Sequence, residues 1–470
     1  MAVMSASGTP MLQRRLGVWS ASALVVSNMI GTGIFTTTGF LAGDLGDAWL
    51  VLGVWVVGGV FALAGAFCYA ELAINIPKSG GEYAYLTRAF GPVWGFLSGW
   101  VSFFAGFSAP IAAAALAFAG YLAFVFPALG PASSPYSRDL AGITWQLGFP
   151  QVIAAGLVFV LALLNCVPVS VVARVQNVLT TIKVVVIGAF VTLGFTVGQG
   201  NWSNLGGAAE RTSATPLPEQ FAVSLFWVMF GYAGWNAATY VAEEIDSPRR
   251  TLPRALTLGT LAVMLLYFAL NVVFVFAVPL EQMKGVVAVG ALAATAMFGP
   301  QAAWMFSLLM ALAIVSTVNA MTTIGPRVYY AMARDGAFLA PAARLSPRSQ
   351  VPVVAIACQA ACAMIMCFTS FPQLVVYIGF CLTFFNVLAV ASLVGFRRQE
   401  GWQCLPVVSF AFPLVPAAYL AVGAWMIYFG FRLRPGISAA AVATLILGAA
   451  VYYAPSRRPR PQGPAPSYES

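Results

Sequence analysis

The chain has 470 residues, of which 60% are hydrophobic and only 8% charged, and its mean hydropathy is +0.87. Because a soluble domain carries about 25% charged residues, this composition excludes an ordinary soluble protein and indicates a polytopic membrane protein. Histidine is absent, which removes the commonest proton-relay and metal-ligand side chain. We expect no cofactor and no metal site.

Apolar segments long enough to cross a bilayer follow one another along the chain, with no cleavable signal peptide before the first. The sequence therefore predicts an all-α polytopic membrane protein with 12 transmembrane helices. The predicted spans are residues 17–43, 49–75, 93–125, 150–167, 175–198, 219–242, 253–278, 300–332, 351–370, 373–396, 405–429 and 437–453.

The net charge of +9 follows the membrane topology and does not indicate a nucleic-acid partner. With a cytoplasmic N-terminus, 17 of the 23 basic residues lie in inside segments and 5 in outside segments. This asymmetry is the positive-inside signature, and it places both termini in the cytoplasm. The inside residues are Arg14, Arg15, Lys78, Arg88, Arg174, Arg249, Arg250, Arg254, Arg327, Arg334, Arg344, Arg348, Arg397, Arg398, Arg457, Arg458 and Arg460.

The first span is interrupted near its middle, at residues 27–35, where Gly31 and Gly33 loosen the helix. A freed backbone group in hydrocarbon costs several kcal/mol, so such a break is viable only inside protein or beside a cavity. There it offers amides and half-helix ends to a charged ligand. A second apolar segment is interrupted in the same way at residues 230–236.

The two breaks open two halves of five spans each, residues 17–198 and 219–396. An odd number of spans per half reverses the second half in the membrane, which is the geometry of an inverted repeat and indicates a transporter. The alternative for each break is a glycine-mediated helix contact or a kink. The remaining parts are tail 1–16, external loop 199–218, spans 397–453 and the proline-rich tail 454–470, which we expect to be disordered.

The inside loop 243–253 carries opposite charges close together. Glu243, Glu244 and Arg249 are candidates for a cytoplasmic gate, in which pairs such as Glu244 with Arg249 form or break as the pathway closes or opens. The alternative is a solvated turn with basic topology anchors.

Several ordered pieces resemble the amino acid–polyamine–organocation (APC) superfamily, and within it the L-type amino acid transporter-like group. They are Ile30-Gly-Thr-Gly-Ile-Phe35, Cys68-Tyr-Ala-Glu-Leu72, Pro77 to Tyr85, Phe230 to Asn236 with Glu243-Glu244, and Pro248 to Pro253. The resemblance implies the LeuT-like fold of five-plus-five inverted repeats with discontinuous helices 1 and 6. It also implies a free amino acid bound between spans one and six.

The physical chemistry of the breaks agrees with this site. The amides of Thr32, Gly33 and Ile34 open the second half-helix, whose positive end suits a carboxylate. The carbonyls near Met29 and Ile30 end the first half-helix and suit an ammonium.

Span six adds carbonyls around Phe230 and Ala233. By the resemblance, Phe230 is an occluding aromatic lid and Asn236 a polar pocket residue. The alternative for Phe230 is a core or lipid-facing aromatic. Many relatives have Gly or Asp where Ala233 stands, so the pocket here differs in size.

Lys183 lies within span five, where a lysine costs about 3 kcal/mol or more on insertion scales. It should therefore face the bundle interior and have a partner, unless its stem snorkels to the interface. By the resemblance it takes the place of sodium and contacts the backbone near Ser27 and the hydroxyl of Thr317. This implies transport without sodium. Because burial favours the neutral amine, a proton-linked role also stays open.

These observations favour a sodium-independent exchanger of neutral L-amino acids that works by alternating access. A proton-coupled symporter and a cationic amino acid or polyamine antiporter stay open, since aromatic faces and carbonyls also hold cations. An amino-acid-sensing receptor is disfavoured by the short tails, and an enzyme by the lack of a catalytic constellation.

The seven cysteines lie within or at the edge of apolar spans, and we interpret them as reduced packing residues. Animal relatives pair with a glycoprotein through a cysteine between spans three and four, and loop 126–149 has none. No disulfide-linked subunit is expected, and the lipid bilayer is the remaining partner. We expect a prokaryotic plasma (inner) membrane protein.

Overall fold

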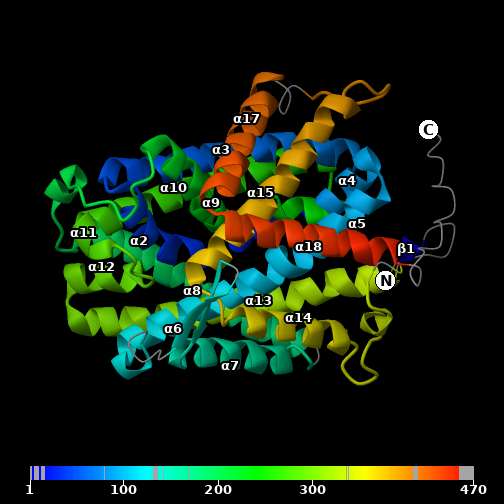
Figure 1. Ribbon diagram of the computed structural model, residues 1–470. Helices are drawn as coiled ribbons and strands as arrows, with labels where there is room; N and C mark the ends of the chain where they lie inside the picture. Colours follow the sequence, from blue (N-terminus) through cyan, green and yellow to red (C-terminus); the bar gives the residue numbers. More distant parts are fainter. Residues whose placement is uncertain are drawn as a thin grey trace.

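The computed structural model describes residues 3–4, 10–11 and 16–454, apart from residues 79, 131–135, 141, 168, 335, 337 and 406–410. Long helices pack side by side in one bundle (Figure 1). Eight described helices are long and apolar enough to cross a membrane, and the bent pair α1 and α2 brings the number to nine. The chain is therefore a helical multi-span membrane protein. Most of both predicted tails, 1–16 and 454–470, lies outside the described residues.

The first half of the chain contains the broken span and four further predicted spans. Its helices are α1 (Val18–Met29), α2 (Gly33–Leu45), α3 (Ala48–Asn75), α4 (Glu82–Phe90), α5 (Pro92–Val101), the π-helical η1 (Ser102–Ser108), α6 (Ala109–Val125), η2 (Pro127–Leu129), α7 (Phe149–Leu164) and α8 (Val169–Thr196). Helices α5, η1 and α6 run on as one apolar rod, Pro92–Val125.

The second half begins after the short η4 (Trp202–Gly206) with another interrupted segment. Its helices are α9 (Leu217–Gly231), the 3-10 helix η5 (Ala237–Glu244), α10 (Pro248–Ala277), α11 (Leu280–Met283), α12 (Val289–Phe298), α13 (Pro300–Arg334), η6 (Ala340–Ala343), α14 (Val353–Met366), α15 (Phe371–Phe396), α17 (Leu414–Leu433) and α18 (Pro435–Tyr453). Helices α17 and α18 are the least buried of the candidate spans.

Most predicted spans agree with these helices to within a few residues. Helix α17 begins at Leu414, and residues 406–410 of the predicted span 405–429 lie outside the described residues. Residues 411–413 form a turn, and Pro413 has no N–H for an earlier helical turn. Helices α7, α9 and α14 have 16, 15 and 14 residues, short for a full crossing. The count of 12 spans therefore stays a prediction.

Loop 126–149 contains structure that the hydropathy pattern did not indicate. Strands β3 (Tyr136–Leu140) and β4 (Ile143–Leu147) form an antiparallel hairpin. The Gln146 N–H donates to the Phe368 carbonyl at 2.7 Å, which ties the hairpin to the connection between α14 and α15. At the other end of the described chain, β1 (Val3–Met4) pairs with β2 (Pro10–Met11).

The broken helices lie in the centre of the bundle, where α10 packs against both α1 and α3. Local sequence sets the ends of these elements. Gly46, at φ +68°, ends α2, and the Asp47 carboxylate accepts the Leu50 N–H at 2.9 Å to cap α3. Trp55 of α3 is fully buried and packs edge-on against Tyr232 and Tyr267, close to both breaks.

Candidate functional site

The first break lies where the glycine pattern predicts it. Helix α1 ends at Met29, α2 begins at Gly33, and the two helices differ in direction by 46°. In the described chain, the N–H groups of Thr32, Gly33 and Ile34 make no backbone hydrogen bond. All three residues are buried. The start of α2 thus presents partnerless amides in the protein interior, which is the arrangement that suits an anion.

The second break is also present. Helix α9 ends at Gly231, a turn covers residues 232–236, and η5 follows. Gly234 has φ +95°, and a Cβ there would lie 3.0 Å from Asn28 of α1, so the turn requires glycine for both conformation and space. Phe230 is 8% exposed, and the Phe230 carbonyl accepts the Ala233 N–H at 3.3 Å.

The two breaks touch each other. A Cβ at Gly33 would lie 2.5 Å from the Gly231 Cα and 3.2 Å from the Phe230 ring. A Cβ at Gly231 would in turn lie 2.7 Å from the Trp55 ring. The structure thus brings Phe230 next to Thr32, Gly33 and Ile34, although Phe230 lies about two hundred positions later in the sequence.

The carbonyls that end α1 already have side-chain donors. The Tyr267 hydroxyl is 2.6 Å from the Met29 oxygen, and the Lys183 Nζ is 2.8 Å from the Ile30 oxygen. The hydrogen bonds that α1 loses at the break are therefore replaced by residues of α10 and α8. An ammonium group could share the Ile30 oxygen, which keeps a second lone pair. The Met29 oxygen also accepts the Gly31 N–H at 2.8 Å, so both of its lone pairs are engaged, and its role as a substrate contact stays a prediction.

Lys183 is buried, at 5% exposure, as its cost within a span predicts. Its partner is the Ile30 carbonyl and not the backbone near Ser27, which was the expected contact. Ser27 is exposed on α1. Thr317 of α13 lies beside the break, because a Cβ at Gly31 would be 3.8 Å from the Thr317 Cγ2.

Sequence reasoning missed Tyr267. This residue of α10 is fully buried, and its hydroxyl lies 2.6 Å from the Met29 oxygen and 3.2 Å from the Gly231 oxygen. It therefore contacts both broken helices at once. The available signal was a single polar aromatic in the middle of an apolar span, which is weak because tyrosine is common in membrane helices.

Sequence reasoning also missed a group of polar side chains around Gln176, which lies on α8 between the start of the helix and Lys183. The Gln176 Nε2 donates to the Ser316 Oγ at 3.0 Å, and the Asn319 Nδ2 donates to the Gln176 Oε1 at 2.8 Å. Asn165 of α7 donates to the Asn319 Oδ1 at 2.9 Å. These uncharged hydrogen bonds join α7, α8 and α13, so they fix the helix that carries Lys183.

Asn236 was expected to line the pocket. Its Nδ2 instead donates to the carboxylate of Glu82, the first residue of α4. Tyr240, four residues later, also donates to Glu82, at 2.6 Å. The polar residue after the second break is therefore engaged with α4, and its pocket role stays a prediction.

The predicted gate residues lie at the end of η5 and in the first turn of α10. Glu243 and Glu244 are half-buried and Arg249 is exposed. In this conformation of the described chain, Glu244 and Arg249 form no ion pair with each other. The Leu16 N–H donates to the Glu244 carbonyl at 3.0 Å, so backbone bonds join the end of η5 to the residues before α1.

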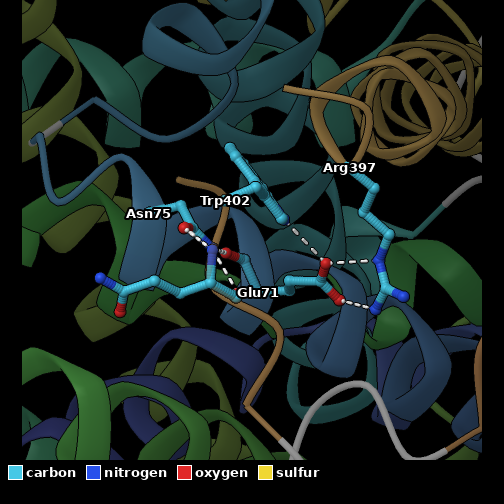
Figure 2. Close-up of polar contacts among 5 residues, drawn as sticks. Glu71, Asn75, Arg397 and Trp402 are labelled. Atoms are coloured by element: carbon cyan, nitrogen blue, oxygen red, sulfur yellow. Dashed lines mark hydrogen bonds and ion pairs between the residues drawn. The ribbon is translucent and has the colours of Figure 1, made fainter. Parts of the chain in front are cut away.

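A buried ion pair lies at the end of α3, in the motif Cys68 to Leu72. Figure 2 shows the Glu71 carboxylate facing Arg397 and Trp402. Arg397 makes two hydrogen bonds to Glu71, at 2.6 and 2.5 Å, and the Trp402 Nε1 donates at 3.0 Å. On the next turn, Asn75 exchanges hydrogen bonds with the Gln403 backbone. This cluster fastens α3 to the end of α15.

Comparisons with known proteins agree with this geometry. The sequence profile of the amino acid permease family matches residues 16–456. The large neutral amino acids transporter small subunit 2 of Mus musculus is 29% identical over 456 residues, which cover 96% of this chain and 82% of that protein.

Two further relatives come from the same animal. The Asc-type amino acid transporter 1 of Mus musculus is 27% identical and covers 94% of this chain and 81% of its own length. The b(0,+)-type amino acid transporter 1 of Mus musculus is 26% identical over 83% of this chain and 77% of its own length. The chain belongs to the amino acid permease family of the APC superfamily and is an amino acid transporter of the membrane, not an enzyme.

Proposed function

We propose that this transporter is a sodium-independent exchanger of neutral L-amino acids, which binds its substrate between the two breaks and works by alternating access. The observation that carries the proposal is the set of buried, partnerless amides of Thr32, Gly33 and Ile34 at the start of α2. They offer a carboxylate three backbone donors at the positive end of a helix.

The charge of Lys183 supports the absence of sodium coupling. Its ammonium group contacts the Ile30 carbonyl at 2.8 Å inside the bundle. A cation fixed by the first break supplies the positive charge that a bound sodium ion would supply, with no ion gradient. The name of one relative, the large neutral amino acids transporter small subunit 2, supports a neutral substrate.

The membrane arrangement is part of the proposal: 12 spans with a five-plus-five repeat, both termini inside, in a prokaryotic plasma membrane. Cys404 is exposed after α15, in a segment proposed to be cytoplasmic. In a variant in which the other cysteines are replaced, an impermeant maleimide should label Cys404 in inside-out vesicles. Labelling of right-side-out vesicles would contradict this topology.

Counterflow tests the transport mode. In proteoliposomes, labelled leucine or alanine should accumulate only when unlabelled amino acid is preloaded, and replacement of sodium by choline should change nothing. Accumulation in empty vesicles under an imposed proton gradient would overturn exchange in favour of symport. A preference for arginine or agmatine over leucine and alanine would overturn the neutral substrate.

A further inference from the structure

Glu82 carries a carboxylate in the interior, where α4 begins. The residue is 9% exposed, and three side chains from two other elements donate to it. The Tyr69 hydroxyl lies 3.0 Å from Oε1, the Asn236 Nδ2 donates to the same oxygen, and the Tyr240 hydroxyl lies 2.6 Å from Oε2. In the part of the chain that the structure describes, no lysine or arginine pairs with Glu82.

Helix η5 packs closely against the start of α4. Asn236 directly precedes η5 and Tyr240 lies within it, so Glu82 holds the start of the half-helix that follows the second break. Gly81 has φ +52°, and a Cβ there would lie 2.9 Å from the Tyr240 ring. Because η5 is a 3-10 helix with a non-helical residue at Val241, its own hydrogen bonds hold it weakly. Its position depends on what it packs against.

Glu82 is also connected to the second break and, through η5, to the residues before α1. The Tyr69 ring packs edge-on against Trp235, within the second break, at 4.7 Å between centroids. At the far end of η5, the Asp246 N–H donates to the Leu16 carbonyl at 3.0 Å, beside the Leu16–Glu244 bond. Movement of η5 away from α4 therefore carries the start of α1 with it.

We propose that Glu82 is a positioning residue for transport: its carboxylate docks η5, together with the start of α1, against α4, and each transport cycle releases and re-forms this docking. The inference rests on the proposed alternating access. In this proposal, η5 separates from α4 when the Glu82 carboxylate loses its hydrogen bonds to Asn236 and Tyr240.

The sign of the pH effect follows from burial. Burial raises the pKa of Glu82 above its usual value, against the smaller lowering effect of its hydrogen bonds. A carboxylate released into water returns to its usual pKa, so the docked state binds the proton more tightly. Protonation favours docking, and rising pH favours release. The titratable groups that face Glu82 are all phenols: Tyr69, Tyr85, Tyr240 and Tyr419.

Two substitutions separate charge from shape. Glu82→Gln imitates the protonated side chain, because its oxygen accepts from Tyr69 and Asn236 while its amide donates to the Tyr240 hydroxyl. Glu82→Leu removes every acceptor. Glu219→Gln is the matched control, since Glu219 is a carboxylate at the other end of α9, paired with Arg432 at 3.3 Å.

Hydrogen–deuterium exchange of residues 237–244 in reconstituted protein measures the docking of η5 independently of transport activity. The quantity compared is the protection factor, which is the observed exchange rate corrected for the base-catalysed intrinsic rate at each pH. In the wild type, the protection factor should fall as pH rises. Glu82→Leu should have a protection factor about tenfold or more lower at every pH, because hydrogen bonds to a charged group are lost. Glu82→Gln should keep its protection and lose the pH dependence of the protection factor, and its counterflow rate should fall while its substrate Kd is unchanged.

A wild-type protection factor in Glu82→Leu, or an undiminished pH dependence of the protection factor in Glu82→Gln, would overturn the proposal. Should Glu82→Leu not fold, the comparison of Glu82→Gln with the wild type decides alone. Absence of counterflow in the wild type with the expected exchange pattern would overturn the proposed function and leave the docking in place.

Discussion

Gly33 and Gly231 bring the two broken helices into backbone contact. A Cβ on Gly33 would lie 2.5 Å from the Gly231 Cα and 2.9 Å from its nitrogen. Real Cβ atoms are not found so close to a backbone atom, so one break must move when the other gains a side chain. The substrate site we propose therefore depends on two glycines, one from each half of the chain.

The first prediction concerns Gly33→Ala. The added methyl group pushes α2 and α9 apart at the amides proposed to bind the carboxylate, so substrate affinity should fall at least about tenfold and Gly33→Val should abolish transport. Equilibrium binding of labelled leucine measures the loss. Gly188→Ala is the control, because a Cβ at Gly188 of α8 meets nothing within 4 Å. Normal binding by Gly33→Ala would contradict a site at this contact.

The second prediction concerns Lys183→Ala. Its ammonium group is replaced by empty space beside the Ile30 carbonyl, so the first break loses the contact that fixes it. Counterflow should fall about a hundredfold or more, while size-exclusion behaviour stays that of folded protein. Lys284→Ala is the control, since Lys284 is half-buried and pairs with the exposed Glu281. Wild-type counterflow by Lys183→Ala would remove the role assigned to this residue.

The third prediction concerns Tyr267→Phe. The change deletes one hydroxyl, 2.6 Å from the Met29 oxygen and 3.2 Å from the Gly231 oxygen, and keeps the ring. Both breaks then lose a shared donor, and counterflow should fall about fivefold, in line with one buried hydrogen bond of about 1 kcal/mol. Tyr329→Phe is the control, because its hydroxyl donates to the Ser102 carbonyl, at 3.3 Å, and not to either broken helix in the described chain. Equal rates in the two variants would show that the Tyr267 hydroxyl is dispensable.

The breaks and the burial of Lys183 were predictable from sequence because each breaks a strong local rule. Glycines at 31 and 33 interrupt an apolar run, and a lysine inside a span is costly unless it faces the protein interior. The same reasoning could not find the Ile30 contact. Which carbonyl a long side chain reaches depends on how α8 lies against α1, and that is set by packing across the whole bundle.

The roles of Glu82 and Tyr267 could not be predicted from sequence for a related reason. Glu82 follows two glycines in a polar loop, where a carboxylate normally faces water. Its burial results from Tyr69, thirteen positions earlier, and from Asn236, more than one hundred and fifty positions later. No pattern within one segment carries such a relationship.

The last prediction concerns the ion pair of Glu71 and Arg397 (Figure 2). Their side chains are 2% and 13% exposed, so Arg397→Ala leaves a buried carboxylate with the Trp402 N–H but without its cation. Loss of one partner of a buried pair costs about 3–5 kcal/mol. We expect a clear drop in the unfolding temperature in detergent, with the substrate Kd unchanged, because the pair joins α3 to α15 away from both breaks.

The exposed pair of Glu219 and Arg432, at 3.3 Å, is the control. Its Arg432→Ala variant should lose at most about 1 kcal/mol, since water screens the charges. The double variant Glu71→Leu with Arg397→Leu should recover much of the loss, because it removes the unpaired charge together with its partner. If Arg397→Ala is no less stable than Arg432→Ala, the pair at the end of α3 does not fasten the bundle. The single variants Glu71→Leu and Arg397→Leu complete the comparison. If the double variant loses as much unfolding free energy as the two single variants together, the loss comes from packing around Trp402 and Phe412 and not from charge.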